Sequence, residues 1–320
     1  MFTREWNLRL SEGRALPSAP RTPASWPSWL GLWLLRLAAR LPWPIARTLG
    51  RAVGTLAQRA LHSRRRAAAT NLRLCFPELS DGERESLLNA HFQELGIGVL
   101  ETVRAWWATD RQLAPFFEST RIEGLEHLHA LARESRGALL VSGHFVNMEF
   151  CARLLTPHLR FAGMYQRYHN RVFERAIKQG RLRHTVAMFD NTEIRAAVRH
   201  LKRGGVLWYA PDQDMRGKDT VFAPFFGIPA ATITATHQLA RLSGCAVVPF
   251  FHRRQVEGGR DMYHMRLGEP LGDFPSADPA ADTARVNAEV EAMARAAPAQ
   301  YLWIHRRFKR QPDGGGDLYQ

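Results

Sequence analysis

The stretch that decides the fold runs from Gly137 to Glu149 and reads Gly-Ala-Leu-Leu-Val-Ser-Gly-His-Phe-Val-Asn-Met-Glu. Its apolar first half predicts a short buried strand over 137–143, and the segment 147–155 predicts the helix that follows. The turn between these two elements carries His144. A histidine placed there lies where α/β proteins gather their functional side chains, in the loop after a strand.

Glu149 follows His144 by five positions, and the two residues form the first candidate catalytic pair. Inside one helix, residues five apart lie about 140° apart and face different sides. With His144 in the turn and Glu149 early in the helix, the side chains can instead converge. A carboxylate beside an imidazole orients the ring and stabilises its protonated form, which suits a general base acting on an alcohol. The spacing alone fits a structural histidine and a solvated acid equally well.

From residue 137 onward, stretches with strand and helix character alternate along the chain. The predicted strands cover 137–143, 159–165, 205–210, 245–252 and 261–267. The predicted helices cover 147–155, 170–181, 192–203, 231–242 and 282–296. This alternation indicates an α/β fold in which helices cover a mixed, mostly parallel sheet. Upstream, Ser80-Asp-Gly-Glu83 matches a capping box and predicts a long helix that ends near residue 107, before a strand over 116–122 and a helix over 125–134.

The segment 26–62 is predicted to form a helical hairpin that is seated on a membrane and broken at Pro42-Trp43-Pro44. Its apolar run, 26–35, is shorter than the ~20 residues of a spanning helix. Tryptophans at 26, 29, 33 and 43 suit the headgroup boundary, where indole rings partition. A short spanning helix or a helix buried in the protein core fits the same composition.

Amino-acid composition predicts the character of the remaining regions of the chain. Residues 1–25 are polar, contain arginine and proline, and lack the apolar core of a secretory signal, so we expect a flexible arm. A catalytic domain is expected over 63–310, and a disordered tail over 311–320, which includes Gly314-Gly-Gly316.

The chain has 320 residues and carries 44 Lys and Arg against 30 Asp and Glu, a formal net charge of +14. This excess predicts acidic partners, such as phosphorylated lipid, an anionic membrane or an acidic protein. Nucleic acid is disfavoured, because no nucleic-acid-binding motif accompanies the charge. Cys75, Cys151 and Cys245 are scattered and odd in number, so they are expected to be core residues in a reducing compartment.

Two polar clusters follow predicted strands. Arg167, in Tyr165-Gln-Arg-Tyr-His-Asn170, can bind a phosphate or carboxylate through its guanidinium fork, and a plain surface arginine is the alternative. Asp212 and Asp214 end an apolar strand and could bind a metal, clamp Arg167 or accept from backbone amides. One carboxylate pair without a matching set of ligands is thin evidence for a metal.

Two further segments combine aromatic residues with features of a binding site. The stretch 221–234 is predicted to be an aromatic, proline-rich loop that leads into a helix, and it suits a long hydrocarbon ligand or simple loop packing. The stretch 302–310 mixes aromatic and basic residues, which suits an acidic partner or a solvated tail. The chain has no Gly-x-Ser-x-Gly elbow, P-loop, Gly-x-Gly-x-x-Gly or His-Glu-x-x-His motif, which disfavours serine hydrolases, nucleotide enzymes and zincins.

Taken together, these segments resemble the late acyltransferases of lipid A biosynthesis, the lauroyl/myristoyl transferase family within the lysophospholipid acyltransferase-like superfamily. The likeness runs from about residue 26 to 310. It is carried by Asn71-Leu-Arg-Leu-Cys-Phe-Pro-Glu78, His144-x4-Glu149, Tyr165-Gln-Arg167 with Asn170, Gly180-Arg-Leu-Arg183, Trp208 to Asp214, Val221 to Phe226, Thr232 with Thr234, Leu239 to Gly244, and Tyr301 to Lys309. Gln213 stands where many members of the family have histidine.

This resemblance implies a glycerolipid acyltransferase-like fold and an enzyme at the cytoplasmic face of the inner membrane. Its implied reaction transfers a fatty acyl chain from acyl carrier protein to a hydroxyl of a Kdo-bearing lipid A precursor, without a cofactor or metal. His144 would act as the base and Glu149 would orient it. Substrate contacts would fall to Arg167, Asn170, Asp212, Asp214, Thr232 and Thr234, with Asp212 fixing Arg167.

Three other readings stay open. The nearest is an acyltransferase that uses a different lipid or glycolipid acceptor. A metal-dependent hydrolase would use His144, Asp212 and Asp214. A non-catalytic, basic membrane-binding protein would associate with lipid even without His144.

Overall fold

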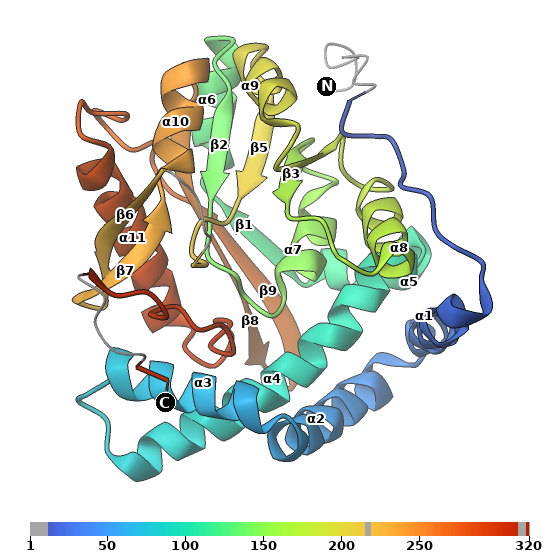
Figure 1. The fold of residues 1–320 in the computed structure, drawn as a ribbon. Helices are drawn as coiled ribbons and strands as arrows, with labels where there is room; N and C mark the ends of the chain where they lie inside the picture. The colour runs from blue at the N-terminus through green and yellow to red at the C-terminus, as the bar shows by residue number, and fades with distance from the viewer. Residues whose placement is uncertain (1–11, 215–218, 313–317, 320) are drawn as a thin grey trace.

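A seven-stranded sheet forms the centre of the protein in this computed structural model, which describes residues 12–214, 219–312 and 318–319 (Figure 1). Only β8 and β9 pair antiparallel, and the other five pairs are parallel. The predicted α/β fold with a mostly parallel sheet is therefore confirmed. In spatial order the strands are β1 (Thr120–Glu123), β9 (Arg260–Leu267), β8 (Ala246–Glu257), β2 (Ala138–Val141), β5 (Val206–Tyr209), β3 (Ala162–Tyr165) and β4 (Met188–Asp190).

Helices cover both faces of this sheet, which explains why β2 is apolar at every position. Leu140 points into one core with helices α4 (Asp81–Trp107), α5 (Asp110–Glu118), α6 (Leu125–Arg133), α7 (Met148–Leu155) and α8 (Arg171–Arg181). Leu139 and Val141 point into the opposite core with α9 (Ile194–Lys202), α10 (Ala235–Ser243) and α11 (Pro279–Ala296). Strand β2 is therefore held by packing on both of its faces, and the turn with His144 begins at its end.

Two predicted segments differ from the structure. Residues 116–122 were expected to be one strand, but α5 extends to Glu118 and β1 begins only at Thr120. A capping box between Thr109 and Gln112 starts α5, and this signal outweighs the strand character of its end. The segment 221–234, expected to be a loop leading into a helix, is a hairpin of β6 (Thr220–Phe225) and β7 (Ile228–Ile233).

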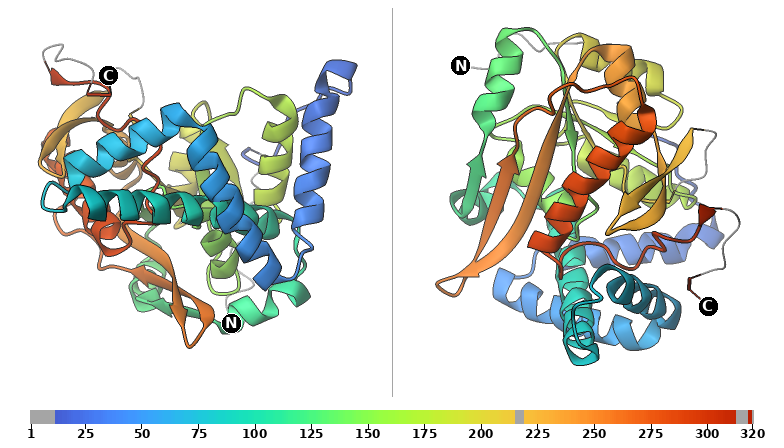
Figure 2. Two further views of the ribbon diagram at one scale, coloured as in Figure 1. Left: turned by 90° about the horizontal axis from the view of Figure 1, so that it is seen from below. Right: turned by 90° about the vertical axis from the view of Figure 1, so that its left-hand side faces the viewer.

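The segment 26–62 forms two helices, α1 (Trp26–Ala38) and α2 (Trp43–Ala60), which are separated at the expected proline break. A third helix, α3 (His62–Cys75), follows. Gly54 of α2 and Gly96 of α4 let these two helices touch, because a Cβ on either glycine would lie 2.0 Å from a backbone oxygen of the other helix. Seen from below, the blue helices α1 and α2 lie against the cyan α4 (Figure 2, left).

No helix within the described residues is both long enough and apolar enough to cross a membrane.

The ends of the described chain pack against the fold. Part of the expected flexible arm, residues 1–11, lies outside the described residues. Gly13, however, accepts a backbone hydrogen bond from Met188 of the edge strand β4 and donates one to Glu193. In the expected disordered tail, residues 313–317 and 320 lie outside the described residues, whereas Tyr319 is buried and donates to Asn71 at 2.5 Å.

Candidate active site

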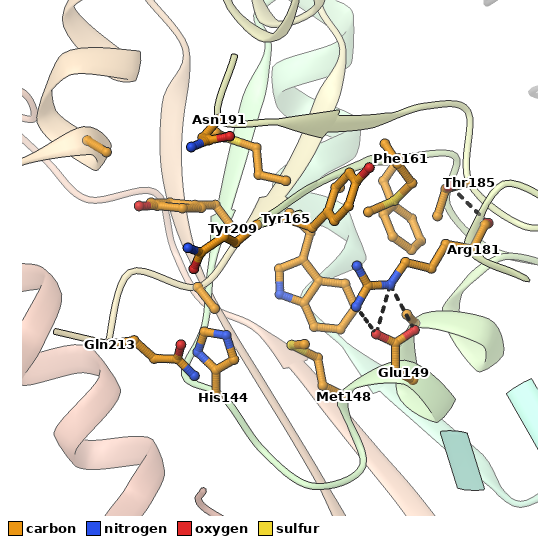
Figure 3. A pocket seen from close by; sticks show the side chains of 18 of the residues that line it. His144, Met148, Glu149, Phe161, Tyr165, Arg181, Thr185, Asn191, Tyr209 and Gln213 are labelled. Atoms are coloured by element: carbon orange, nitrogen blue, oxygen red, sulfur yellow. Dashed lines mark hydrogen bonds and ion pairs between the residues drawn. The ribbon is translucent and has the colours of Figure 1, made fainter. Parts of the chain in front are cut away.

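An apolar pocket of about 190 Å³ opens at the carboxyl ends of β2 and β5. Figure 3 shows His144 and Gln213 at one end of this pocket and Phe161, Thr185 and Arg181 at the other. Its apolar wall comes from α7 and from the neighbouring strands, through Met148, Ala152, Phe161, Met164, Met188, Trp208 and Ile233. The pocket can therefore hold an apolar chain beside a single imidazole.

His144 is held by Asp212, which follows the end of β5. The Nδ1 atom of His144 lies 2.5 Å from Oδ1 of Asp212, and the backbone N–H of His144 donates to Oδ2 at 2.8 Å. Asp212 is buried, whereas the His144 side chain keeps about a quarter of its surface exposed. Because Nδ1 faces a carboxylate, it carries the ring hydrogen, and Nε2 keeps its lone pair.

Asp212 keeps its charge in this buried position. Burial by itself would raise the pKa of the Asp212 carboxyl, but the charge of His144 and its two hydrogen bonds outweigh burial and lower the pKa to about 2. An ionised carboxylate stabilises a protonated imidazole, so the pair can accept a proton at Nε2 and hold it.

Glu149 forms a different pair in the wall of the same pocket. Its carboxylate accepts hydrogen bonds from Nε of Arg181 at 2.9 Å and from Nε1 of Trp106 at 3.0 Å, and Nη2 of Arg181 completes a forked contact. Burial would raise the pKa of Glu149, but the Arg181 guanidinium outweighs burial and keeps the pKa below its usual value. Figure 3 draws this ion pair across the pocket from Gln213.

The expected contact between Glu149 and His144 is therefore wrong, and Asp212 takes that place. Both predicted residues line the pocket, as their spacing suggested. The carboxylate of Glu149, however, lies in the first turn of α7 and meets the guanidinium that α8 supplies. The catalytic roles of the two residues stay predictions.

Arg167 and Asn170 do not meet Asp212 either. Nε of Arg167 donates to Asp190 at 2.8 Å, so the predicted clamp by Asp212 is wrong, and the side chain is more than half exposed. Asn170 caps α8, since its Oδ1 accepts from the N–H groups of Val172 and Phe173. Its Nδ2 donates to Ser28 of α1, which ties the N-terminal helices to α8.

The other predicted contact residues point away from the pocket. Nε of Arg310 binds Asp214 at 2.7 Å. Thr232 is fully buried, where it accepts from Arg307 at 2.6 Å, and Thr234 donates to the carbonyl of Asp219. Because side chains alternate along β7, the residue between the two threonines, Ile233, faces the pocket instead.

The aromatic segments also turn inward. Phe225, Phe226, Trp303 and Phe308 form one buried cluster and act as core. Phe222 of the same hairpin and Lys309 are exposed. Arg307 is buried with them, which contradicts a solvated basic tail.

The sequence did not predict two contacts of the site. These are the contact of Arg181 with Glu149 and that of Asp212 with His144. Arg181 and Asp212 both stand in segments that carry the family likeness, which was the available signal. Within the described residues, no three His, Cys, Asp or Glu side chains cluster as metal ligands. A metal-dependent hydrolase would need His144, Asp212 and Asp214 together as ligands. Asp214 instead binds Arg310.

The fold and the pocket define a class, an α/β protein with a carboxylate-held histidine at one end of an apolar pocket. Residues 18–310 match the family model described as bacterial lipid A biosynthesis acyltransferase. The chain therefore belongs to this family, and it is an acyltransferase.

Similar proteins carry names of the same kind. The lipid A biosynthesis lauroyltransferase of Escherichia coli (strain K12) is 38% identical over 93% of this chain and 96% of its own length. The lipid A biosynthesis palmitoleoyltransferase of the same organism is 35% identical over 93% of this chain and 95% of its own. The crystal structure of the 1-acyl-sn-glycerophosphate acyltransferase PlsC from Thermotoga maritima covers 81% of this chain and 99% of its own, with 13% identity and a TM-score of 0.40, too low to establish a shared fold.

Proposed function

We propose that this chain is a lipid A secondary acyltransferase that moves a fatty acyl chain from acyl carrier protein to a hydroxyl of a Kdo-bearing lipid A precursor. The observation that carries the chemistry is the 2.5 Å contact between Nδ1 of His144 and buried Asp212, at the end of an apolar pocket. Family membership supports the lipid A pathway. Donor and acceptor are inferred from the family likeness and from the net charge of +14, which suits an acidic carrier and a phosphorylated lipid.

The proposed reaction is a direct transfer. Nε2 of His144 takes the proton of the acceptor hydroxyl while its oxygen attacks the thioester carbonyl. The carbon–sulfur bond then breaks, and the imidazolium returns the proton to the departing thiolate. The products are a new ester and the free thiol of the carrier, so atoms and charges balance without a cofactor.

Asp212 supplies the charge that makes this base effective. It fixes the tautomer with hydrogen at Nδ1 and stabilises the imidazolium while the proton is held. A positioned base of this kind contributes about 10²–10⁴-fold to the rate. The Glu149–Arg181 pair holds a fixed charge in the wall of the pocket, where it can position the reacting groups.

The acyl chain would lie in the apolar part of the pocket, along Met148, Phe161 and Met188. The names of the two Escherichia coli relatives specify different acyl groups, although the two have similar identity to this chain. We expect this enzyme to use a lauroyl or myristoyl donor.

The N-terminal helices are proposed to seat the enzyme on the cytoplasmic face of the inner membrane. The pattern of side chains on α2 is the opposite of that on an ordinary surface helix of a soluble protein. Its small residues Ala46, Gly50 and Gly54 face the protein interior. Large apolar residues of α1 and α2 face outward, namely Trp26, Leu30, Trp33, Leu34, Leu37, Ile45, Leu49, Val53 and Leu56, each more than two-fifths exposed. Such a continuous surface fits a bilayer interface. Trp43 is an exception, because it donates to Asp261 inside the protein.

Helix α9 offers a docking surface for the acidic carrier protein. Arg195, Lys202 and Arg203 are exposed on or next to it. Arg195 follows Ile194 of the pocket wall, whereas Lys202 and Arg203 lie at the other end of the helix. Salt should weaken the apparent affinity for acyl carrier protein if this surface steers the carrier.

The test is complementation with mass spectrometry. A strain that lacks its own lauroyl-type transferase should regain one acyl chain on lipid A when this chain is expressed. The His144→Ala variant should restore none, while the exposed His158→Ala variant should act as the wild type. Purified protein should use acyl carrier protein thioesters directly. An acyl chain found on a different lipid would favour the alternative acceptor, and full activity of His144→Ala would refute the assigned base.

A further inference from the structure

The turn that carries His144 is closed by a segment far along the chain. The backbone N–H of Leu302 donates to the carbonyl of His144, and the N–H of Val146 donates to the carbonyl of Gln300, each at 2.9 Å. Phe145 and Tyr301 pair as an isolated antiparallel bridge. The path of the turn therefore depends on where residues 300–302 are held.

Gln300 holds that segment through its side-chain amide. Its Oε1 accepts from the backbone N–H of Arg254 in β8 at 2.9 Å, and its Nε2 donates to the carbonyl of Arg254 at 2.6 Å. The same Oε1 accepts from Nδ2 of Asn147 at 3.0 Å. One amide thus joins the sheet to the turn after His144.

Asn147 completes the bridge, and its side chain therefore does not cap its own helix, α7. It occupies the N-cap position of α7, where asparagine commonly caps the first turn, but its side chain makes no capping hydrogen bond. Its Oδ1 instead faces Nδ1 of His252 at 3.0 Å. Since Nδ2 of Asn147 already donates to Gln300, Nδ1 of His252 must be the donor.

His252 is suited to this fixed role. It is fully buried between the rings of Phe145 and Trp208, with centroids 5.3 Å from each. Burial lowers the pKa of His252 to about 3, so the ring stays neutral and keeps the same donor across the working pH range.

We propose that Asn147 and Gln300 are positioning residues, which act as one unit to hold the turn so that His144 meets both Asp212 and the pocket. This inference rests on the proposed role of His144 as the base. Neither amide is part of the pocket lining, and neither has a hydrogen bond to Asp212. Their effect on the reaction therefore passes through the turn and the start of α7.

The decisive variant is Asn147→Ser, assayed in the full chain with acyl carrier protein thioester and acceptor lipid. Serine can restore the cap of α7, which supports folding, but it cannot bridge His252 and Gln300 together. We expect kcat to fall at least tenfold, with the KM for the acyl donor changed less than threefold and a melting temperature close to that of the wild type. Unchanged kcat in Asn147→Ser would overturn the inference.

A matched control and a coupling test separate positioning from stability. Asn287 is equally buried and donates to the β6 carbonyl of Pro224, away from the turn, so Asn287→Ala should lower the melting temperature and leave kcat within threefold. Loss of kcat in Asn287→Ala equal to that in Asn147→Ser would count against positioning. The double variant Asn147→Ser/Gln300→Ala should lose no more activity than Gln300→Ala alone, and additive losses would contradict a single unit. If the wild type transfers no acyl chain, the proposed function fails first.

Discussion

Two carboxylates, one behind the histidine of the pocket and one in the pocket wall, have different basic partners. Asp212 holds the imidazole of His144, which can accept a proton at Nε2, whereas Glu149 holds the guanidinium of Arg181, which stays protonated. Only the first pair can pass a proton during a reaction. The second can hold and orient charge. The carboxylate that lies close to His144 in the sequence is therefore not the one that touches it in the fold.

The largest effect that tests this comparison is expected from Asp212→Asn. The amide can donate to Nδ1 of His144 and so favour the tautomer with hydrogen at Nε2, which cannot accept the substrate proton. We expect kcat to fall by about 10²–10⁴-fold with little change in the KM for the acyl donor. Steady-state kinetics beside His144→Ala give the measurement. A kcat within threefold of the wild type would show that another group orients the base.

Glu149→Gln is expected to act mainly on stability. It leaves the Arg181 guanidinium buried without a counter-charge, which costs about 3–5 kcal/mol of the free energy of unfolding. The double variant Glu149→Gln/Arg181→Met should recover most of this loss, because both charges are then gone. Urea unfolding of the three proteins decides the point. If the single variant is as stable as the wild type, the pair is not a buried ion pair in solution.

Lowering the pH is expected to have a smaller effect, on the part of the unfolding free energy that depends on the charge of Asp212. The pKa of Asp212 is about 2 in the folded protein, below its ordinary value of 3.8, so its ionised form stabilises the fold above about pH 4. That contribution is lost as pH falls from about 4 to 2. The difference in unfolding free energy between the wild type and Asp212→Asn should therefore shrink by about 2 kcal/mol over this range. Urea midpoints at pH 5, 4, 3 and 2 measure it, and a constant difference would contradict the lowered pKa.

The smallest effect on the fold is expected from Arg167→Ala. Its pair with Asp190 is more than half exposed on the arginine side, and such pairs contribute about 0–1 kcal/mol. If Arg167 binds a substrate phosphate, the KM for the acceptor lipid should rise several-fold while the melting temperature stays near that of the wild type. An unchanged KM would leave Arg167 as a surface residue.

Local patterns in the sequence predicted local structure well. The apolar run before His144 gave strand β2, the capping box at Ser80 gave the start of α4, and the prolines at 42 and 44 gave the break between α1 and α2. Each of these signals acts within a few residues of itself, through side-chain burial, capping or a missing N–H.

Such local patterns could not predict contacts between distant segments. Asp212 lies 68 positions after His144, and only the neighbouring strands β2 and β5 bring the two together. The segment 221–234 was expected to be a proline-rich loop, yet Pro224 and Pro229 pair with each other in a two-stranded hairpin. A two-stranded hairpin has open edges, where a residue without an N–H loses no ladder hydrogen bond.

The closure of the histidine turn by residues 300–302 also sets an order on biosynthesis. Gln300 is added 153 residues after Asn147, so a ribosome must complete almost the whole catalytic domain before the bridge between them can form. Helices α1 and α2 emerge long before that point. A nascent chain can therefore form its N-terminal helices first, and the turn with His144 is closed only when the last helix and the segment after it have folded back onto it.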